Sequence, residues 1–451
     1  MKVHRKFWTL ICIVGFTLPG MAWAGPGTRP LTLSEAIAAA VKQNPRMVGA
    51  RHGLEAAGHQ VTTARSGLLP QLNLSETFNR TNSPLWAFGT KLNQGEIQSS
   101  DFIPDELNDP DAVNNFNTAL SLSWNLFDGG QTRIGWRQAQ QGRRAAELGL
   151  LRTEQQVISQ VAKAYIGLLL AGENLEVIER ALETSYAHLK LVEDRFRSGL
   201  AVKSDVLRAQ VRIADLEQQR LLAGSQVQVA QAGLYAAMGR EDTGPVAPST
   251  PFERCIVPEG ELAQWMDRAL KQRPDFKQLD VRQIIAQQSV NRVKSGHMPT
   301  LLFQGNYEIN SEDFSDSHDN YTLGALVRVN LYSGQRISSQ AAAAKAKVAQ
   351  VKAMRKGLEL AVRLETQKAF YQAQSTWQSI TVARKAVAQA EEGLRIVGNR
   401  YAGGLLTIVD LLDAQVALQQ ARTRHFKALH DYKVARIDLA LATGTIDKDF
   451  R

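Results

Sequence analysis

The segment TALSLSWNLFDGG, Thr118 to Gly130, contains two patterns that organise the whole chain. Up to Phe127 it alternates large apolar side chains with small polar ones, which is the period-two pattern of a β-strand with two unlike faces. The glycine pair then leads into residues 131–196, which contain no proline and extend over roughly 99 Å if they form one helix. A strand followed directly by so long a helix is not expected in an ordinary globular domain.

The chain contains two related halves, because several of its motifs recur farther along. Two offsets describe the recurrence, 229 residues before the strands and 205 residues after them, so an insertion of 24 residues lies between Pro70 and Asn125. The paired motifs are LSEAIAAAVKQNP (Leu33–Pro45) with LAQWMDRALKQRP (Leu262–Pro274), NLFDGG (Asn125–Gly130) with NLYSGQ (Asn330–Gln335), and RFRSGL (Arg195–Leu200) with RYAGGL (Arg400–Leu405). We therefore predict a first repeat at residues 25–244, a Pro/Gly-rich linker at 245–259 and a second repeat at 260–451.

Each half supplies two alternating segments of about 10 residues, a length that suits a tilted strand crossing a bilayer. One segment follows Pro70, one follows Pro299, and the others are Thr118–Phe127 and Tyr321–Leu331. A soluble β-sandwich is the alternative, but it needs more strands and a second sheet to cover the apolar face. Four strands cannot close a barrel, since the smallest bacterial barrels have about eight, so two, three or four chains must pool their strands.

The connection between the first two strands is long and is expected to face the outside, as the longer loops of barrels do. It contains Trp86 and Phe88, which either pack within the connection or bind a ligand. Packing is the simpler of these two roles.

The long helical segments show apolar residues at three- and four-residue spacing, which predicts coiled-coil-like packing, with an ordinary buried helix core as the alternative. We expect Ser204–Met238 and Leu262–Ser295 to stack end to end beside the first long helix. Beside the second long helix, residues 336–399, we expect Leu405–Leu441 to be completed by Leu33–Ser66. The chain would then close as a cylinder.

Residues 1–24 have the layout of a cleavable signal peptide, with basic residues, an apolar run from Phe7 to Leu18 and the small-residue site Ala22-Trp23-Ala24. We expect the mature chain to begin at Gly25 with a free N-terminus, because Cys12 lies inside the apolar run. Only Cys255 then remains, so no intrachain disulfide can form. After residue 24 the sequence has no run of 18 or more apolar residues, so we expect no membrane-spanning helix.

Charge and histidine placement argue against two classes of function. The formal net charge of +9 falls to +6 without Lys2, Arg5 and Lys6, and the remaining basic residues alternate with acids along the helices, so we expect no nucleic-acid partner. The eight histidines are scattered, and His425 and His430 lie five residues apart instead of the three or four that share a helix face. We therefore predict no enzyme activity, no metal site and no cofactor.

Two halves, each with two strands and a long helical hairpin, resemble the TolC-type outer membrane efflux family over essentially the whole mature chain. The most specific residues lie at the helix turns, DRFRSGLAVKSDVLRAQ (Asp194–Gln210) and NRYAGGLLTIVDLLDAQ (Asn399–Gln415). The resemblance implies a mixed α and β membrane protein, a homotrimer whose four strands per chain form a twelve-stranded barrel in outer membrane lipid, continued by a coiled-coil-like α-helical tunnel in the periplasm. It also implies a passive exit duct for efflux or type I secretion, coupled to a periplasmic adaptor and an inner-membrane pump.

The resemblance assigns gate roles at the turns. Asp410 and Asp413, three residues apart on one helix face, match the pair that forms acidic rings at the family's periplasmic constriction. Tyr401 matches the gate tyrosine, and Asp205 matches a residue that ties the closed tip by hydrogen bonding. The gate arginine of the family is Leu406 here, which puts the usual polar network in doubt.

The tips are also expected to contact the adaptor, because turns at the far end of such long helices are the surfaces that reach across the periplasm. The six tip residues are Arg195, Gly199, Leu200, Arg400, Gly404 and Leu405. For Asp205 and Asp410, capping of the return helices is the alternative role. A periplasmic coiled-coil adaptor or scaffold is the alternative for the whole chain, but such a protein lacks strands of bilayer length.

Overall fold

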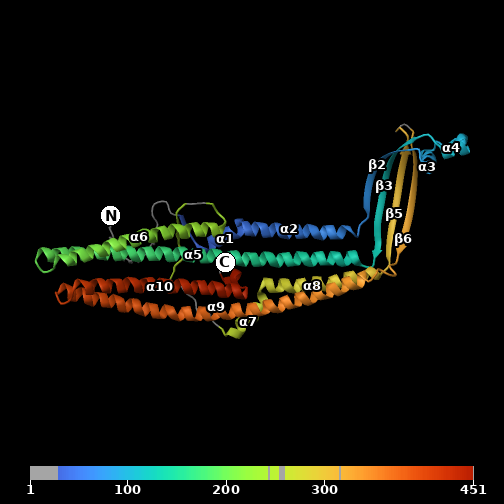
Figure 1. Cartoon of the computed structure of the whole chain (residues 1–451). Coiled ribbons are helices and arrows are strands. Elements are labelled where there is room, and N and C mark those ends of the chain that lie inside the picture. Colours follow the sequence, from blue (N-terminus) through green and yellow to red (C-terminus); the bar gives the residue numbers. More distant parts are fainter. Residues whose placement is uncertain (1–28, 242–243, 253–259, 314–315, 450–451) are drawn as a thin grey trace, which may run out of the picture.

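The computed structural model describes residues 29–241, 244–252, 260–313 and 316–449. The predicted signal peptide, residues 1–24, lies outside the described residues, as do residues 253–259 of the predicted linker. A long bundle of helices carries a four-stranded sheet at one end (Figure 1). The larger elements, in chain order, are α1 (Leu33–Gln43), α2 (Pro45–Ser66), β2 (Gln71–Thr81), α3 (Pro84–Gln94), η1 (Ser99–Phe102), α4 (Pro104–Asn108), β3 (Val113–Asp128), α5 (Gln131–Arg197), α6 (Lys203–Met238), α7 (Leu262–Gln272), α8 (Pro274–Lys294), η2 (Ser295–His297), β5 (Thr300–Ser311), β6 (His318–Arg328), α9 (Arg336–Ala402), α10 (Ile408–Thr443) and α11 (Ile446–Asp449).

The two longest helices, α5 and α9, have 67 residues each and run the length of the bundle. Each begins after two residues with positive φ, a conformation in which glycine is not strained. Before α5 these residues are Gly129 and Gly130, with φ of 68° and 86°. Before α9 they are Gly334 and Gln335, with φ of 59° and 64°. The DGG and SGQ motifs therefore mark the sharp turn from strand to helix in both repeats, as the sequence predicts.

The two shorter helical segments are each broken in the middle. We expected Leu33–Ser66 and Leu262–Ser295 to be continuous, but each is divided by an X-Pro step into two helices. The residue before proline avoids the helical region because its backbone would contact the proline ring. Asn44 and Arg273 accordingly have ψ of 130° and 124°. Each break lies at mid-height of the bundle.

The sheet has the order β2-β3-β5-β6, with all neighbouring strands antiparallel. The register places the large apolar residues of all four strands on one face, where Leu74 opposes Leu120, and Tyr307 opposes both Leu120 and Tyr321. The other face carries mostly amide and hydroxyl side chains. On the apolar face Leu74 is 73% exposed, so in the single chain nothing covers it. The four predicted strands and their two unlike faces are confirmed.

The predicted pairing of the stacked helices was wrong. The C-terminal end of α6 meets the start of α2, so these two helices line up along α5. Likewise the end of α10 meets the start of α8, and α8 packs between α5 and α9 (Figure 1). The strand order is the physical reason: α2 leads into β2 beside β3, and α8 leads into β5 between β3 and β6. The helices therefore enter the bundle in the order in which their strands pair.

A two-stranded parallel ribbon lies beside the bundle at mid-height, formed by β1 (Arg29–Leu31) and β4 (Val246–Pro248). Tyr165 on α5 is fully buried and holds this ribbon against the bundle. Its hydroxyl donates to the carbonyl of Leu31 at 2.8 Å and accepts from the Ser249 amide at 3.1 Å. The largest hydrophobic core cluster surrounds this point. Within the described part of the chain, no helix has both the length and the apolar character needed to cross a membrane.

Candidate functional site

The end of the bundle opposite the sheet consists of two hairpin tips with the same backbone geometry. Gly199 and Gly404 have φ of 72° and 76°. After α5, the amide of Leu200 donates to the carbonyl of Arg195 at 2.8 Å, and after α9, Leu405 donates to Arg400 at 2.9 Å. This left-handed glycine cap with its six-residue hydrogen bond satisfies the last carbonyl groups of a helix. Glycine adopts this positive-φ conformation without strain at both positions.

The leucines that follow the glycines remain on the surface. Leu200 is 73% exposed and Leu405 is 77% exposed, although leucine is usually buried. The two tips thus present paired apolar side chains on tightly defined turns. Arg400 is also exposed at this end.

The two tips are joined by Arg195. Its guanidinium donates to the carbonyl of Tyr401 at 2.6 Å and to that of Ala402 at 2.9 Å. The same guanidinium lies 4.8 Å from the centre of the Tyr401 ring, within the range of a cation–π contact. Because these carbonyls end α9, the positive charge also lies at the negative end of the helix dipole.

Tyr401 is 4% exposed and belongs to a small hydrophobic cluster that holds the tips together. The buried members of the cluster are Val192, Val206, Tyr401, Ile408 and Leu411, which come from all four helices of the two hairpins. The expected gate tyrosine is therefore buried between the hairpins, with its ring against Arg195. Sequence reasoning placed Arg195 among the adaptor contacts and missed this inter-hairpin link.

The aspartates at the start of the return helices cap them. In α10, the carboxylate of Asp410 accepts from the amide of Thr407 at 2.9 Å and from its hydroxyl at 2.7 Å. The hydroxyl hydrogen bond, followed by the amide bond, holds the pKa of Asp410 below its usual range. In α6, Asp205 accepts from the amide of Val202 at 3.4 Å. The capping role weighed for both aspartates is thus present in the single chain.

Asp413 lies one turn after Asp410 on α10, and both are exposed. The structure therefore brings the four expected gate residues, Tyr401, Asp205, Asp410 and Asp413, and the six expected tip residues to one end of the bundle. Leu406, where the resemblance led us to expect an arginine, is half-buried in the second turn.

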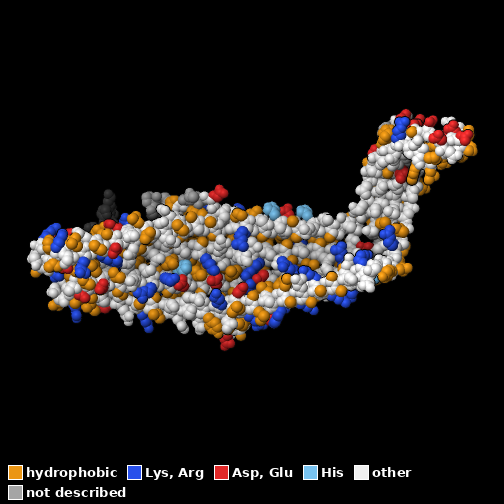
Figure 2. Space-filling view, viewed as in Figure 1, with side chains coloured by type: hydrophobic (Ala, Val, Ile, Leu, Met, Phe, Trp, Pro, Cys, Tyr) orange, Lys and Arg blue, Asp and Glu red, His pale blue; other side chains and the backbone are white. Residues whose placement is uncertain are grey.

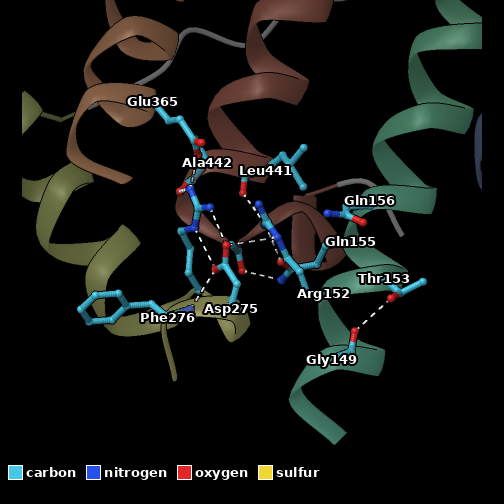
Figure 3. Close-up of polar contacts among 12 residues, drawn as sticks. Gly149, Arg152, Thr153, Gln155, Gln156, Asp275, Phe276, Glu365, Leu441 and Ala442 are labelled. Atoms are coloured by element: carbon cyan, nitrogen blue, oxygen red, sulfur yellow. Dashed lines mark hydrogen bonds and ion pairs between the residues drawn. The ribbon is translucent and has the colours of Figure 1, made fainter. Parts of the chain in front are cut away.

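A second polar centre, not predicted from the sequence, lies where α10 meets α8 (Figure 3). Arg273 is 2% exposed, and its guanidinium binds Asp275 at 2.7 Å and Glu365 at 2.5 Å. Arg152 of α5 donates to the carbonyl of Leu441 at 3.1 Å and lies 3.6 Å from Asp275. Burial opposes ionisation of Asp275, but the Arg273 hydrogen bonds and the Arg152 charge lower its pKa overall. The network joins α5, α8, α9 and α10 at mid-height.

The first repeat has a neutral version of this junction. Asn44, the counterpart of Arg273 at the 229-residue offset, donates to the carbonyl of Ala237 at 2.8 Å. Arg273 donates to the carbonyl of Ala442, the counterpart of Ala237, at 3.4 Å. The sequence feature that could have indicated this charged junction is the replacement of KQNPR (residues 42–46) by KQRPD (residues 271–275) in the second repeat. Among the described residues, no group of His, Cys, Asp and Glu side chains has an arrangement that suits a metal ion.

Comparison with known proteins agrees with this architecture. The family model for the outer membrane efflux protein (OEP) matches residues 36–240 and 265–445, one match in each half. Outer membrane protein TolC of Vibrio cholerae is 27% identical over 445 residues, covering 96% of this chain and 93% of that protein. Proteases secretion protein PrtF of Dickeya chrysanthemi is 23% identical over 441 residues, covering 95% and 91%.

The crystal structure of VceC from Vibrio cholerae superposes with a TM-score of 0.73 at 21% identity, covering 91% of this chain and 96% of that one, which shows the shared fold. Family members are non-enzymatic outer-membrane channels for efflux or type I secretion with a periplasmic extension, and membership implies a homotrimer within a tripartite system. With both of its halves matched by the family model, this chain belongs to the outer membrane efflux protein family.

Proposed function

We propose that this outer-membrane channel is a passive exit duct whose hairpin tips form both its periplasmic gate and its docking surface for an adaptor, which connects it to an inner-membrane pump. The observation that carries the gate is the Arg195 link, which joins the first hairpin to the second through the carbonyls that end α9. The two hairpin tips are held together by these hydrogen bonds and by the small cluster around Tyr401, so breaking a few contacts could convert a closed arrangement into an open one. The pump and adaptor then determine the cargo.

The acidic residues of α10 form the selective part of this gate. In a homotrimer, Asp410 and Asp413 contribute six carboxylates around the axis of the tunnel at its periplasmic end. The Thr407 cap supports this role, because it lowers the pKa of Asp410 and so opposes the rise that neighbouring carboxylates in a ring would cause. Rings of carboxylates attract cations, so divalent or polyvalent cations bind there and reduce conduction.

The gate is tested in planar bilayers with the purified trimer. The double variant Asp410→Asn, Asp413→Asn removes the charge but keeps an oxygen acceptor for the Thr407 cap. We expect it to lose block by polyvalent cations added from the periplasmic side and to show a higher resting conductance. Added salt should weaken the block in the parent channel, because it screens exposed charges.

The matched control is Asp215→Asn, which removes an exposed aspartate from α6, farther from the tip. It should leave the block unchanged. If the double variant is blocked as strongly as the parent, the acidic gate is excluded and capping is the only role left for Asp410.

The adaptor surface rests on the exposed tip leucines. Leu200 and Leu405 directly follow the turn glycines, and the hydrogen bonds of these turns fix the positions of both leucines. The exposed apolar side chains are therefore available to contact a partner helix. Replacing both by aspartate places charge on this contact without changing the turn residues. We expect loss of export from cells while trimers still form in the outer membrane.

Leu364→Asp is the matched control, because Leu364 is 68% exposed but lies near the middle of α9, far from the tips. It should export normally. Normal export by the double tip variant would contradict docking at the tips, whereas loss of trimers would point to a defect in assembly and require the milder pair Leu200→Ser, Leu405→Ser.

A further inference from the structure

Residues 84–108, between β2 and β3, lie at the end of the sheet farthest from the long helices, where α3 contacts the strands and α4 projects beyond them (Figure 1). Gln94, the last residue of α3, is 1% exposed. Its amide nitrogen donates to the carbonyl of Asn114 at 2.7 Å and to the side-chain oxygen of Asn115 at 2.9 Å. The next residue, Gly95, lies so close to His318 of β6 that a Cβ there would be 2.6 Å from the imidazole. This segment is therefore docked across β3, β5 and β6.

The docked face is the polar face of the sheet. The side chains of Asn115 and Asn117 both donate to Asn310 at 2.9 Å, and Asn310 pairs with His318 in the register. The opposite face exposes apolar side chains such as Leu74 and Leu323, at 73% and 65%. In a transmembrane barrel the apolar face contacts lipid and the polar face lines the interior. Helix α3 consequently lies on the inside of the barrel wall.

The segment has its own internal structure. The rings of Phe88 and Phe102 pack edge to face at 5.7 Å, and Lys91 binds Asp101 at 2.8 Å. The Lys91 hydrogen bond is the largest influence that lowers the pKa of Asp101. Phe88 therefore packs within the connection, as the sequence analysis expected, whereas Trp86 is 68% exposed.

The segment does not dock through charge. Acidic side chains gather over α3 and α4, on the surface that faces solvent (Figure 2). The contacts to the sheet are made instead by the neutral Gln94 and by Gly95, which has φ of 72°. Hydrogen bonding and close backbone approach therefore hold the segment in place.

We propose that residues 84–108 form a second constriction, an inward-folded lid that narrows the outer mouth of the barrel and limits the size of solutes that enter from outside. A helix with its side chains is about 10–12 Å across, so three copies occupy much of a mouth of this size. A twelve-stranded barrel lies between barrels of about 8 strands, which side chains fill, and those of about 16, which leave an aqueous channel. The lid would thus act at the opposite end of the duct from the tip gate.

The test uses a reporter cysteine on the lumenal face, below the lid. Ser123 lies on the polar face, opposite Gln71 and Gln304, about 25 Å along β3 from Asn115 at ~3.3 Å per residue. The variant Ser123→Cys is made in a Cys255→Ser background, so that the mature chain has one thiol. Intact cells are treated with maleimides that carry polyethylene glycol of graded length, which reach Ser123→Cys from outside only through the mouth.

With the lid present, we expect the shortest maleimide to label the reporter and the longest to label it at least tenfold more slowly. Replacing residues 84–108 by a short Gly-Ser linker should remove this difference. Reagent that entered through the periplasmic gate would label the reporter equally with and without the lid, so the comparison with the deletion isolates the mouth. Equal labelling by short and long reagents in the lidded channel would overturn the proposal.

A point variant keeps the test valid if the deletion does not assemble. Gln94→Glu replaces the donor nitrogen by an oxygen that faces the Asn114 carbonyl and the Asn115 side-chain oxygen, so the lid should undock and long reagents should label faster. Asn93→Asp is the matched control, since it adds the same charge at the neighbouring, exposed position. If Gln94→Glu forms trimers and labels as slowly as Asn93→Asp with the long reagent, α3 does not control the mouth.

Discussion

Arg195 and Tyr401 are 206 residues apart in the chain, yet the guanidinium of the first donates to the carbonyl of the second at 2.6 Å and lies 4.8 Å from its ring. The two residues belong to different repeats and to different hairpin tips. Their contact gives Tyr401 a cationic partner from the other hairpin. This polar contact between the tips uses an arginine of the first hairpin and carbonyl groups of the second.

We predict that Arg195→Lys raises the resting conductance severalfold. Lysine keeps the charge but lacks the planar fork that reaches two carbonyl groups at once. Single-channel recording in planar bilayers measures the effect. Arg400→Lys is the control, because Arg400 occupies the equivalent position in the second repeat and is exposed. Equal conductance in both variants would show that the link does not hold the resting state.

The contact of Arg195 with the second hairpin could not be predicted from the sequence. RFRSGL and RYAGGL match at the first arginine, at the glycine of the turn and at the leucine after it, and the pattern assigns both arginines the same place before a turn. Only the packing of the two hairpins against each other brings Arg195 to the carbonyl groups at the end of α9 and leaves Arg400 exposed. The glycines were predictable, since a turn that requires positive φ is a property of the local backbone.

The strands and long helices were likewise predictable, because periodicity and the absence of proline are local signals. Which helices lie side by side was not, because apolar spacing along α2 or α8 does not name the partner helix. The order β2-β3-β5-β6 supplies that information, and it is fixed by pairing between strands far apart in the chain. The docking of α3 depends in the same way on Gln94 meeting a strand that follows it.

We predict that Asp275→Asn lowers the stability of the trimer by about 3 kcal/mol per chain, since it removes one partner of a buried arginine. Arg273 is 2% exposed and would keep only Glu365 as a carboxylate partner. Thermal unfolding in detergent checks this. Asp267→Asn is the control, because the Asp267–Lys271 pair is exposed and such pairs contribute about 0–1 kcal/mol.

The ion pair between Arg273 and Asp275 should also make the stability of the trimer depend on pH. The pKa of Asp275 is lowered in the folded chain, so its contribution is complete above the ordinary aspartate pKa and is lost as the pH falls through the lowered value. The stability difference between the parent and Asp275→Asn should therefore be constant near neutral pH and shrink only below about pH 4. A difference that already shrinks near pH 6 would assign the effect to another group.

We predict that Tyr165→Phe loosens the mid-height ribbon. Its hydroxyl binds the Leu31 carbonyl and the amides of Ser249 and Thr250, all within 3.2 Å, and unsatisfied buried groups cost about 1–3 kcal/mol. Limited proteolysis should cleave the variant faster near Thr250. Tyr186→Phe is the control, because the Tyr186 hydroxyl binds an exposed glutamate, Glu217. Identical cleavage of the two variants would contradict the proposed fastening.

The last prediction concerns the glycines where stacked helices meet. A Cβ on Gly239 would lie 2.7 Å from both Asn44 Cα and Pro45 Cδ, whereas one on Gly444 would lie 3.1 Å from Arg273 Cα. Both glycines have positive φ, 73° and 72°, which strains an alanine by about 1–3 kcal/mol at either site.

Gly239→Ala should therefore lower the stability more than Gly444→Ala. In addition to the backbone strain from positive φ, its new methyl group would collide with the backbone of Asn44 and the ring of Pro45. Gly233→Ala is the control: it lies inside α6 with nothing within 4 Å, and alanine there should stabilise the helix by about 0.5–1 kcal/mol. The thermal unfolding temperatures of the trimers should thus increase in the order Gly239→Ala, Gly444→Ala, parent, Gly233→Ala. If Gly239→Ala unfolds at the parent temperature, the ends of α6 and α2 do not meet as closely as the structure places them, and the stacking of these helices along α5 must be revised.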